Sequence, residues 1–460
     1  MTFGQQLRLT VSLSMPAILA QLSSIMMQYI DASMVGRLGA DDSAAIGLMA
    51  SSLWLFWGTC SAVTTGFSVQ VAHRIGAKDD AGARDVLRQS LVAVTLFALA
   101  ATLIGLAIAW KLPHWLGGDD TICGQASVYF SVFVAALPVL TLNYLAGGML
   151  RSVGNMKVPS MLNVLMCVLD CIFNFFLIFP TREIMISGNE FTMPGAGLGV
   201  LGAALGTVLA EIVTAGLMFW YLYNRQPELR LRGLRGSYRP RRSIIRKAVA
   251  ISAPMGIEHV VLCGAQIAVT MIVAPLGVCS IAANAFAVTA ESLCYMPGYG
   301  IGEAATTLIG QSYGAGRRDL VVRFGYITVG AAMAVMGVMG VALYIWAPQI
   351  ISVMSPVEEI RTLGAEILRI EAWAEPMFGA AIVSYGFFVG LGRTILPSIM
   401  NLLSIWGVRL TLATLLAPTM GLRGVWLAMC IELCFRGLIF LALLAFGRWR
   451  NEGNENSLLQ

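Results

Sequence analysis

The chain has 460 residues, of which 57% are hydrophobic and only 12% are charged, and its formal net charge is +5. Ordinary soluble domains carry about 25% charged residues, so this composition excludes a soluble globular protein and indicates a membrane protein with many spans. The excess of positive charge gathers in particular loops and requires no nucleic-acid partner.

Apolar segments separated by short polar loops follow one another along the whole chain. Their length, roughly 20 to 30 residues, favours spanning helices over the alternating strands of a membrane barrel. Because Arg8 leads directly into a full-length span, no cleavable signal sequence is expected. We predict an all-α polytopic membrane protein with twelve transmembrane helices, near residues 9–35, 43–72, 88–110, 125–150, 158–180, 196–223, 246–274, 280–312, 322–347, 363–390, 396–418 and 422–447.

Lysine and arginine residues lie mostly on one side of these predicted spans. The side that includes both termini has 22 of the 30, nine of them in the connection 225–247, whereas the other side has 5 and the spans have 3. Cytoplasmic loops are enriched in these residues, so both termini are predicted to face the cytoplasm, with the protein integral to a prokaryotic inner membrane. The basic connection is interpreted as a linker held at the anionic leaflet rather than as a nucleic-acid site.

The two halves of the sequence repeat each other in ten matched positions that all differ by 238 residues. Pro16 matches Pro254 and Gly76 matches Gly314, and an insertion near 183–196 shifts the register only at the sixth span. Each half contains six spans, an even number, so both enter the membrane in the same direction, as in transporters built from parallel repeats. The repeat predicts alternating access between two pseudo-symmetric six-helix lobes. The predicted parts are an N-terminal lobe (1–223), a cytoplasmic linker (224–247) and a C-terminal lobe (248–460).

One carboxylate, Asp31, lies in the first predicted span. A charge inside a spanning helix costs about 2.5–3.5 kcal/mol on insertion scales, so it usually faces a partner or a water-filled cavity. Asp170 and Asn174 lie one helical turn apart in the fifth span, at about the depth of Asp31. Apart from Arg88 at the boundary of the third predicted span, the N-terminal half has no lysine or arginine within its predicted spans, so these acids and Glu211 must bind a cation or hold a proton. We predict that Asp31 and Asp170 share a proton and release it to a wetter side. The alternative for Asp31 is an interfacial carboxylate that caps the following loop, with Arg37 as a partner it could pair with.

Two acids of the C-terminal half, Glu258 and Glu375, are expected near the middle of the membrane. They either contact a cationic substrate or a coupling ion, or stay as buried hydrogen-bonded acids. His259, beside Glu258, is expected to pack rather than to relay protons, although its titration range suits a relay. Aromatic faces accommodate flat organic cations without fixed geometry, although most such side chains only pack against other helices. With that alternative open, the further candidates for the substrate or a second ion are Gln21, Tyr295 and Tyr385.

The arginines within the C-terminal spans are expected to balance acids there. Glu432 and Arg436 are four residues apart on one helix, so they are predicted to form a structural ion pair. Glu371 is expected to be balanced by Arg369 or Arg409 from neighbouring helices.

Several segments with glycine, proline and asparagine at fixed places closely resemble the MATE (multidrug and toxic compound extrusion) family. They are LRSVGNMKVPSMLN at 150–163, its counterpart FVGLGRTILPSIMN at 388–401, MVGRLG at 34–39, VAPLG at 273–277 and the glycine-rich run at 297–316. The resemblance covers essentially the whole chain. It implies a V-shaped transporter of two six-helix lobes that exports organic, often cationic, compounds in exchange for H⁺ or Na⁺.

The resemblance also implies roles for individual residues. It places the family's first-helix aspartate at Asp31, and its fifth-helix asparagine and aspartate at Asp170 and Asn174, with acid and amide exchanged. These three residues are thereby implied to bind the coupling ion, with Na⁺ as a possible ligand there. The family's sodium-coupled branch has acids in helices seven and ten, at positions near Leu262 and Phe378 here. In this chain the acids lie about one turn away, which argues against a sodium site of that type in the C-terminal lobe.

No enzyme activity, metal centre or cofactor beyond the coupling ion is expected. The chain lacks an H-E-x-x-H motif, a plausible G-x-S-x-G site and a histidine set with metal-ligand spacing, and its nine cysteines are interpreted as buried thiols. The alternative function is a flippase for lipid-linked oligosaccharides, from the same broad superfamily. Such proteins tend to carry several cavity-facing cations for phosphate, and few cations lie in these spans. The expected partners are small organic substrates and membrane lipid, and a monomer is expected.

Overall fold

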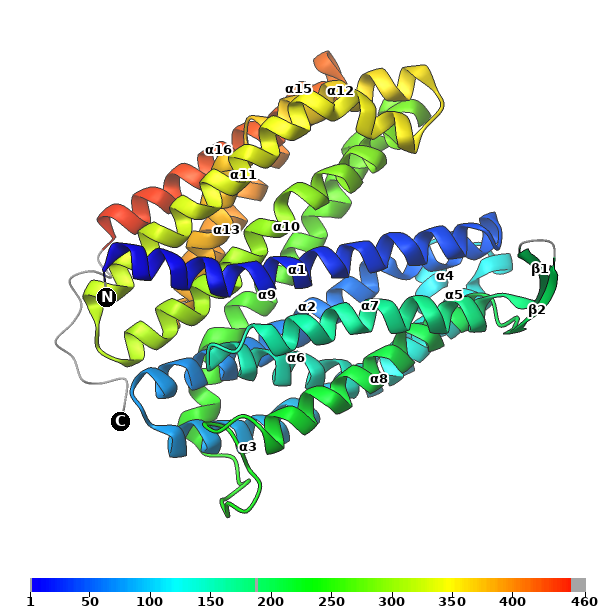
Figure 1. Cartoon of the computed structure of the whole chain (residues 1–460). Coiled ribbons are helices and arrows are strands. Elements are labelled where there is room, and N and C mark those ends of the chain that lie inside the picture. Colours follow the sequence, from blue (N-terminus) through cyan, green and yellow to red (C-terminus); the bar gives the residue numbers. More distant parts are fainter. Residues whose placement is uncertain (1, 187–188, 448–460) are drawn as a thin grey trace. The chain divides into compact units, whose positions relative to one another are not determined.

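The computed structural model describes residues 2–186 and 189–447, with side chains except at 183–191, and nearly all of this chain is helical (Figure 1). In chain order the elements are α1 (Phe3–Gly36), α2 (Ala40–Gly76), α3 (Asp80–Ile108), α4 (Leu112–Trp115), α5 (Asp120–Ala135), α6 (Leu137–Ser152), α7 (Lys157–Ile178), β1 (Pro180–Ile186), β2 (Asn189–Ala196), α8 (Val200–Asn224), α9 (Arg242–Val273), the 3₁₀-helix η1 (Ala274–Leu276), α10 (Val278–Gly314), α11 (Arg318–Met354), α12 (Glu358–Ala372), α13 (Glu375–Gly390), α14 (Ile395–Leu403), the π-helix η2 (Ser404–Leu410), α15 (Thr411–Met420) and α16 (Leu422–Phe446).

The helices coincide with the spans predicted from the sequence. Ten spans in the described chain are long and apolar enough to cross a membrane, and the bent pair α5 and α6 makes an eleventh, with 46° between its parts. Helices α12 and α13 occupy the predicted span 363–390, where α12 carries many charged residues. Each predicted span therefore lies on helical chain, and the all-α polytopic architecture is confirmed.

Proline residues bend or restart helices at matched places in the two halves. Pro138 lies in the first turn of α6 and Pro376, its repeat partner, lies in the first turn of α13. Proline lacks a backbone N–H and clashes with the preceding turn, so a helix bends or restarts there. Pro16 and Pro254 are also repeat partners, and both lie inside long helices, α1 and α9.

The repeat is also visible in how helices pack. Gly148 of α6 lies against Ser68 of α2, because a Cβ on this glycine would overlap the serine hydroxyl. At the matched positions Gly386 of α13 lies against Thr306 of α10, whose hydroxyl donates to the Gly386 carbonyl at 2.9 Å. Lipid is as apolar as the side chains, so close contacts between small residues contribute much of helix association in a membrane. The two halves thus use the same packing contact, as a pseudo-symmetric repeat requires.

The insertion that shifts the repeat register contains an antiparallel hairpin. Strand β1 pairs with β2, from Pro180 opposite Ala196 to Ile186 opposite Asn189. Gly199 follows with a φ of 55°, a conformation that favours glycine, and α8 begins at the next residue. The insertion therefore lengthens the connection between α7 and α8 and leaves both helices intact.

The chain divides into two compact units. One, which we call the N-terminal unit, comprises Leu13–Cys263 and Gly310–Arg317, and the other, the C-terminal unit, comprises Met1–Ser12, Gly264–Ile309 and Arg318–Gln460. The boundaries between these units lie inside α1, α9 and α10. The lobes expected from the sequence, 1–223 and 248–460, have their boundaries at the basic connection instead. Those lobe boundaries stay a prediction.

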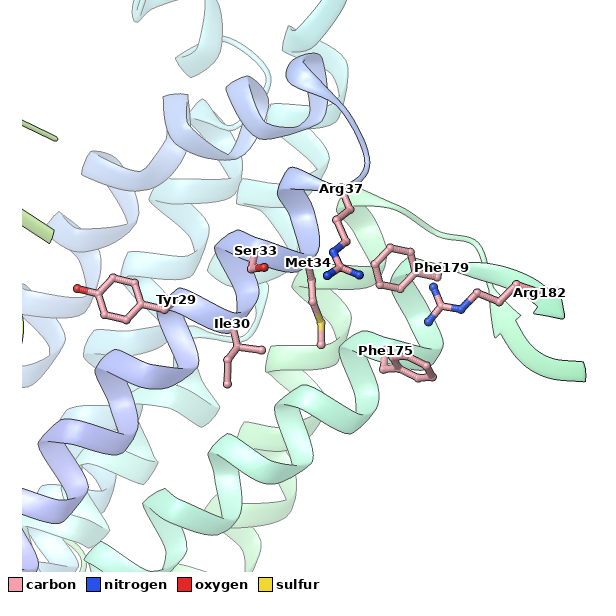
Figure 2. A pocket seen from close by; sticks show the side chains of 8 residues that line it. All are labelled: Tyr29, Ile30, Ser33, Met34, Arg37, Phe175, Phe179 and Arg182. Atoms are coloured by element: carbon pink, nitrogen blue, oxygen red, sulfur yellow. The ribbon is translucent and has the colours of Figure 1, made fainter. Parts of the chain in front are cut away.

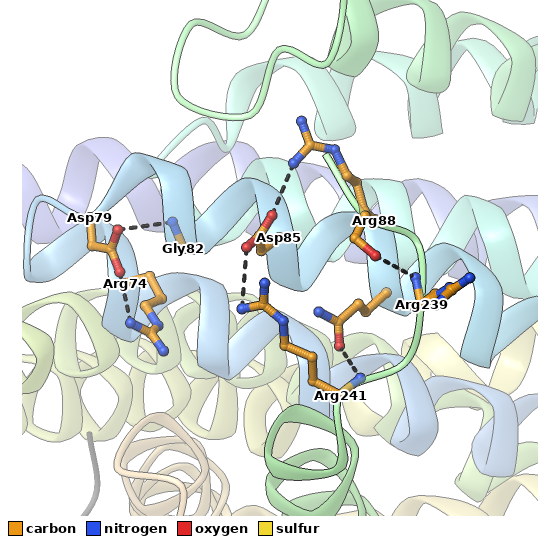
Figure 3. Close-up of polar contacts among 9 residues, drawn as sticks. Arg74, Asp79, Gly82, Asp85, Arg88, Arg239 and Arg241 are labelled. Carbon is orange, nitrogen blue, oxygen red and sulfur yellow. Dashed lines mark hydrogen bonds and ion pairs between the residues drawn. The ribbon is translucent and has the colours of Figure 1, made fainter. Parts of the chain in front are cut away.

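Part of the basic connection packs onto the beginning of α3 (Figure 3). Asp85 of α3 forms ion pairs with Arg88 at 3.0 Å and with Arg241 of the connection at 3.5 Å. The backbone N–H of Arg241 also donates to Oε1 of Gln89 at 2.8 Å. Leu229 of the connection is buried in the same apolar core as α3. Protein contacts therefore hold the connection, while its arginines stay exposed at the surface.

Candidate functional site

Asp31, Asp170 and Asn174 meet where α1 and α7 face each other. The Nδ2 of Asn174 donates to Asp31 Oδ1 at 2.8 Å and to Asp170 Oδ2 at 3.1 Å. Residues four apart on a helix share a face, which is why Asp170 and Asn174 point to the same place. We call these three residues the acid site. The structure thus brings together three predicted residues from distant parts of the sequence.

Helix α8 closes one side of the acid site. Asp170 and Asn174 are 0% exposed, and Asp31 is half-buried. A Cβ on Gly206 of α8 would overlap Oδ1 of Asn174, so the absence of a side chain lets the two helices come this close. The neighbouring Thr207 side chain lies within interaction range of the Asp170 carboxyl. Packing therefore fixes the Asn174 amide with its N–H groups toward the two carboxyls.

The acid site has no built-in cation. Within the described residues neither Asp31 nor Asp170 forms an ion pair, so the pairing of Asp31 with Arg37 is absent, while the interfacial alternative for Asp31 stays open. In the same part of the chain, Oδ1 of Asp170 and Oδ1 of Asn174 have no hydrogen-bond partner. Burying an ionised carboxylate without a compensating charge is costly. Binding of a proton or a cation at the acid site stays a prediction.

A third acid of the N-terminal unit, Glu211 of α8, is also buried without an ion pair among the described side chains. It accepts a hydrogen bond from Nδ2 of Asn143 on α6 at 2.7 Å. An amide donor satisfies one oxygen and supplies no charge, so Glu211 resembles the acid site in its chemistry. The sequence identifies Glu211 only as an acid within a predicted span that has no lysine or arginine to pair with.

The C-terminal unit holds a second group of buried acids. Glu371 at the end of α12 and Glu375 at the beginning of α13 are both 0% exposed. None of their four carboxyl oxygens has a hydrogen-bond partner in the chain that the structure describes. Glu291 of α10 is buried close enough to interact electrostatically with both. Contact of Glu375 with a substrate or a coupling ion stays a prediction.

One acid of the C-terminal unit is fully paired. Glu432 forms ion pairs with Arg409 at 2.7 Å and Arg436 at 3.0 Å, and Ser404 donates to it at 2.6 Å. The predicted Glu432–Arg436 pair is confirmed. Ser404 and Arg409 both lie on η2, where the wider π-helical turn alters the usual helical spacing of side chains.

Neither of the arginines expected to balance Glu371 forms an ion pair with it in the described chain. Arg409 forms its ion pair with Glu432, and it reaches Glu371 only as a longer-range charge. Arg369 is directed elsewhere, because its Nε donates to the backbone carbonyl of Tyr344 at 3.1 Å. Glu371 therefore stays without a direct partner, although arginines are near.

Glu258 and His259 lie in the part of α9 that belongs to the N-terminal unit. Glu258 is 5% exposed. The Nε2 of His259 donates to the backbone carbonyl of Trp54 at 3.0 Å, and the ring fills the space beside Gly58 of α2. His259 thus packs between helices, as expected. Glu375 lies in the other unit, and a shared role for the two acids stays a prediction.

The remaining candidates for substrate contact are partly buried side chains. Tyr295 stacks edge-on against Tyr299 and Phe378, with ring centroids 5.8 and 5.6 Å apart. The hydroxyl of Tyr385 lies 3.3 Å from Oγ of Ser398. Gln21 of α1 is half-buried. The tyrosines have packing partners, so both of the alternatives stated from the sequence stay open.

The sequence matches one family model twice. The MatE model covers residues 16–176 and again residues 254–415, and the two matches begin 238 residues apart, which is the offset of the repeat. The chain belongs to the MatE family. The resemblance inferred from the short glycine and proline motifs is thereby confirmed.

Relatives of this MatE protein cover nearly its whole length. The probable multidrug resistance protein NorM of Thermotoga maritima is 23% identical over 95% of this chain and 92% of its own. The probable NorM of Pseudomonas aeruginosa is 29% identical over 92% of this chain and 85% of its own. A solved MATE structure in the straight conformation has a TM-score of 0.88 at 21% identity, covering 97% of this chain and 96% of its own. A mutant of the Vibrio cholerae MATE transporter VcmN also has a TM-score of 0.88, at 17% identity, covering 100% and 99%.

Some residues around the MatE sites were not singled out from the sequence. Gly206 and Thr207, which shape the acid site from α8, lie in a stretch of small residues that gives no functional signal by itself. Glu291 carried a signal, since an acid within a predicted span is costly. Its place beside Glu371 and Glu375 depends on how three helices meet, which the sequence pattern does not specify.

Proposed function

We propose that this MatE protein is a secondary antiporter that exports organic, often cationic, compounds in exchange for protons by alternating access. The observation that carries the proposal is the acid site, where two carboxyls and one amide meet inside spanning helices without an ion-pair partner in the described chain. The relatives named multidrug resistance proteins support the substrate class.

The orientation of the Asn174 amide favours a proton over Na⁺ as the coupling ion. Hard cations take oxygen ligands, but this amide presents its N–H groups to both carboxyls, while its oxygen lies toward Gly206 of α8. Na⁺ at Asp31, Asp170 and Asn174 is the second candidate, and it requires the amide to turn its oxygen toward the carboxyls. A proton requires no such change.

Exchange follows if proton and substrate favour different states of the acid site. A proton held by Asp31 or Asp170 removes charge, so the two carboxyls and the Asn174 amide can stay buried together between α1 and α7. Loss of the proton leaves charged carboxyls that favour water and a cationic compound. A ligand shifts a conformational equilibrium only by its differential affinity for the two states, and here the proton and the substrate differ in this way.

Substrate contact is proposed for several further side chains. Glu258 and Glu375 supply negative charge, and Gln21, Tyr295 and Tyr385 supply polar and aromatic surface for flat cations. Cationic compounds also interact favourably with thioether and ring-lined surfaces without fixed geometry. In this proposal the protein works as a monomer in the cytoplasmic membrane with both termini in the cytoplasm. Membrane lipid surrounds the protein. The coupling ion is the only ligand required besides the substrate, and no enzymatic step takes place.

The lipid-linked oligosaccharide flippase is less well supported. A flippase needs cations in its cavity to hold phosphate groups. Two arginines within the described C-terminal spans, Arg409 and Arg436, both pair with Glu432, so that acid already neutralises part of their charge.

Dye efflux from everted membrane vesicles tests the proposed antiport. We expect wild-type transport to stop when a protonophore collapses the proton gradient, and to continue when a sodium ionophore collapses only the sodium gradient. Asp31→Asn should abolish transport, whereas Asp41→Asn, a change in the exposed first turn of α2, should leave it unchanged. Wild-type transport by Asp31→Asn under both gradients would falsify the role of the acid site.

A further inference from the structure

The C-terminal ends of α1 and α7 form a groove that the proposed exchange does not use. Its volume is about 310 Å³, and Figure 2 shows the side chains that line it. Those that matter for the argument are Ile30, Met34, Arg37, Phe175, Phe179 and Arg182. Apolar side chains form its wall, and both arginines lie where the two spanning helices end.

Helical spacing builds this groove. Ile30, Met34 and Arg37 lie four and three residues apart, so they follow one face of α1. Phe175 and Phe179 follow one face of α7 in the same way, although Phe179 is already its C-terminal cap. Each helix therefore contributes a short stripe, and the groove runs between the two stripes.

The guanidinium group of Arg182 is held by aromatic rings. Its central carbon lies 4.4 Å from the ring centroid of Phe175 and 4.4 Å from that of Phe179. Stacking uses the flat faces of a guanidinium and leaves the N–H groups at its edge free to donate. In Figure 2, Arg37 extends from α1 toward the same Phe179 ring. The two cations therefore lie at one end of an apolar groove.

The charge of these two arginines has no carboxylate partner among the described side chains, which do not include 183–191. Among the side chains that the structure describes, neither Arg37 nor Arg182 forms an ion pair. Both follow the ends of helices that are long and apolar enough to span a membrane, so they are expected near lipid head groups. Bidentate arginine contacts suit phosphate oxygens.

We infer that this groove binds the phosphodiester of an anionic membrane phospholipid. The phosphate accepts hydrogen bonds from Arg37 and Arg182, and an acyl chain lies along Ile30, Met34 and Phe175. An anionic lipid is preferred to a zwitterionic one because two cations without an ion pair among the described side chains face the phosphate. The lipid belongs to the leaflet at which α1 and α7 end.

A lipid in this position acts on the same two helices that carry the acid site. Asp31 follows Ile30 in α1, and Asn174 precedes Phe175 in α7. A phosphate held by both arginines ties the helix ends together and thereby favours the hydrogen bond between Asn174 and Asp31. The surrounding lipid would thus adjust the stability of the closed α1–α7 contact.

Native mass spectrometry of the detergent-solubilised protein tests the inference without any transport measurement. The protein is titrated separately with phosphatidylglycerol, phosphatidylcholine and inorganic phosphate. We expect phosphatidylglycerol to bind most tightly. Each surface cation contributes about fivefold to binding an anionic lipid, so Arg37→Gln with Arg182→Gln should weaken phosphatidylglycerol binding about 25-fold. Lys111→Gln, which removes an exposed cation after α3, is the control and should bind as wild type does.

Three outcomes would overturn the inference. The double variant could bind phosphatidylglycerol as tightly as wild type, or Lys111→Gln could lose as much affinity, which would indicate diffuse attraction to the surface. Inorganic phosphate could displace the lipid at equal concentration, which would indicate a free-anion site. Arg37→Lys with Arg182→Lys keeps both charges and provides a second test that does not depend on folding of the glutamine variants. Lysine lacks the planar guanidinium group that stacks on aromatic rings and donates two parallel hydrogen bonds. We therefore expect this variant to bind phosphatidylglycerol with an affinity between those of wild type and the glutamine variant.

Discussion

The backbone of Gly76, at the end of α2, lies directly against the carbonyl of Gln311, near the end of α10. At the matched repeat positions Gly314 lies against the carbonyl of His73, and a Cβ on either glycine would overlap that carbonyl. The repeat therefore relates the two contacts, since each joins a glycine of one half to the matched backbone carbonyl of the other half. Nearby, Nε2 of Gln311 donates to the backbone carbonyl of Ser152 at 2.7 Å.

Gly76→Ala or Gly314→Ala should separate the ends of α2 and α10. The overlapping atom is backbone, which cannot rotate away as a side chain can. Overpacking of this kind costs about 1–3 kcal/mol, so we expect a lower thermal unfolding midpoint in detergent. Gly47→Ala is the control on the same helix, because a Cβ there meets nothing within 4 Å. An unchanged midpoint in both of the first two variants would contradict the contact.

Gly206→Ala should impair export through the acid site. Its Cβ would overlap Oδ1 of Asn174 and push the amide away from Asp31 and Asp170. If this costs about 1–3 kcal/mol in the transport-competent geometry, the rate of proton-driven dye export should fall by about fivefold or more. Gly216→Ala, also on α8, meets nothing within 4 Å and should transport at the wild-type rate. Equal rates for both variants would contradict the tight α7–α8 contact.

The sequence predicted the acid site because two simple rules determine it. Charges are costly inside spans, and residues four apart share a helix face. The first rule identifies Asp31 and Asp170, the resemblance to the MATE family singles out Asn174, and the second rule places Asn174 on the face of Asp170. The structure joins the three by two hydrogen bonds from one amide. The same reasoning located ten spans and the bent pair α5 and α6 in the described chain, since apolar length indicates which segments can cross a bilayer. The predicted span 363–390 lies on α12 and α13 and is not apolar enough to be found by length alone.

The partners of the C-terminal acids were not predictable in this way. Arg409 was an equally reasonable partner for Glu371 and for Glu432 by depth alone. The π-helix η2 decides between them, because it directs Ser404 and Arg409 to the same carboxyl. A short π-helical segment does not change the hydrophobic pattern of the sequence. The pairing expected for Glu371 therefore differs from the structure because of a local feature of the helix.

Glu371→Gln and Glu432→Gln should differ in their effect on stability. Glu371 has no direct partner in the described chain, so a neutral amide of the same size should leave the unfolding midpoint within a few degrees of wild type. Glu432→Gln leaves Arg409 and Arg436 without their carboxylate, and breaking a buried pair in this way costs about 3–5 kcal/mol. Thermal unfolding of the two variants in the same detergent measures the difference. A larger loss of stability in Glu371→Gln than in Glu432→Gln would contradict this expectation, because it would mean that the charge of Glu371 stabilises the fold.

Glu375→Gln should weaken export of cationic compounds and spare neutral ones. The change removes a negative charge and keeps the size of the side chain, so only a substrate that uses the charge should respond. A loss of about 1.4 kcal/mol corresponds to a tenfold rise in the half-saturating concentration of a cationic dye. Glu359→Gln, an exposed change on α12, is the control. Competition assays with one cationic and one neutral dye measure both constants in the same vesicles. An equal effect on both dyes would instead assign Glu375 to coupling or to packing, because neither of those roles depends on the charge of the substrate.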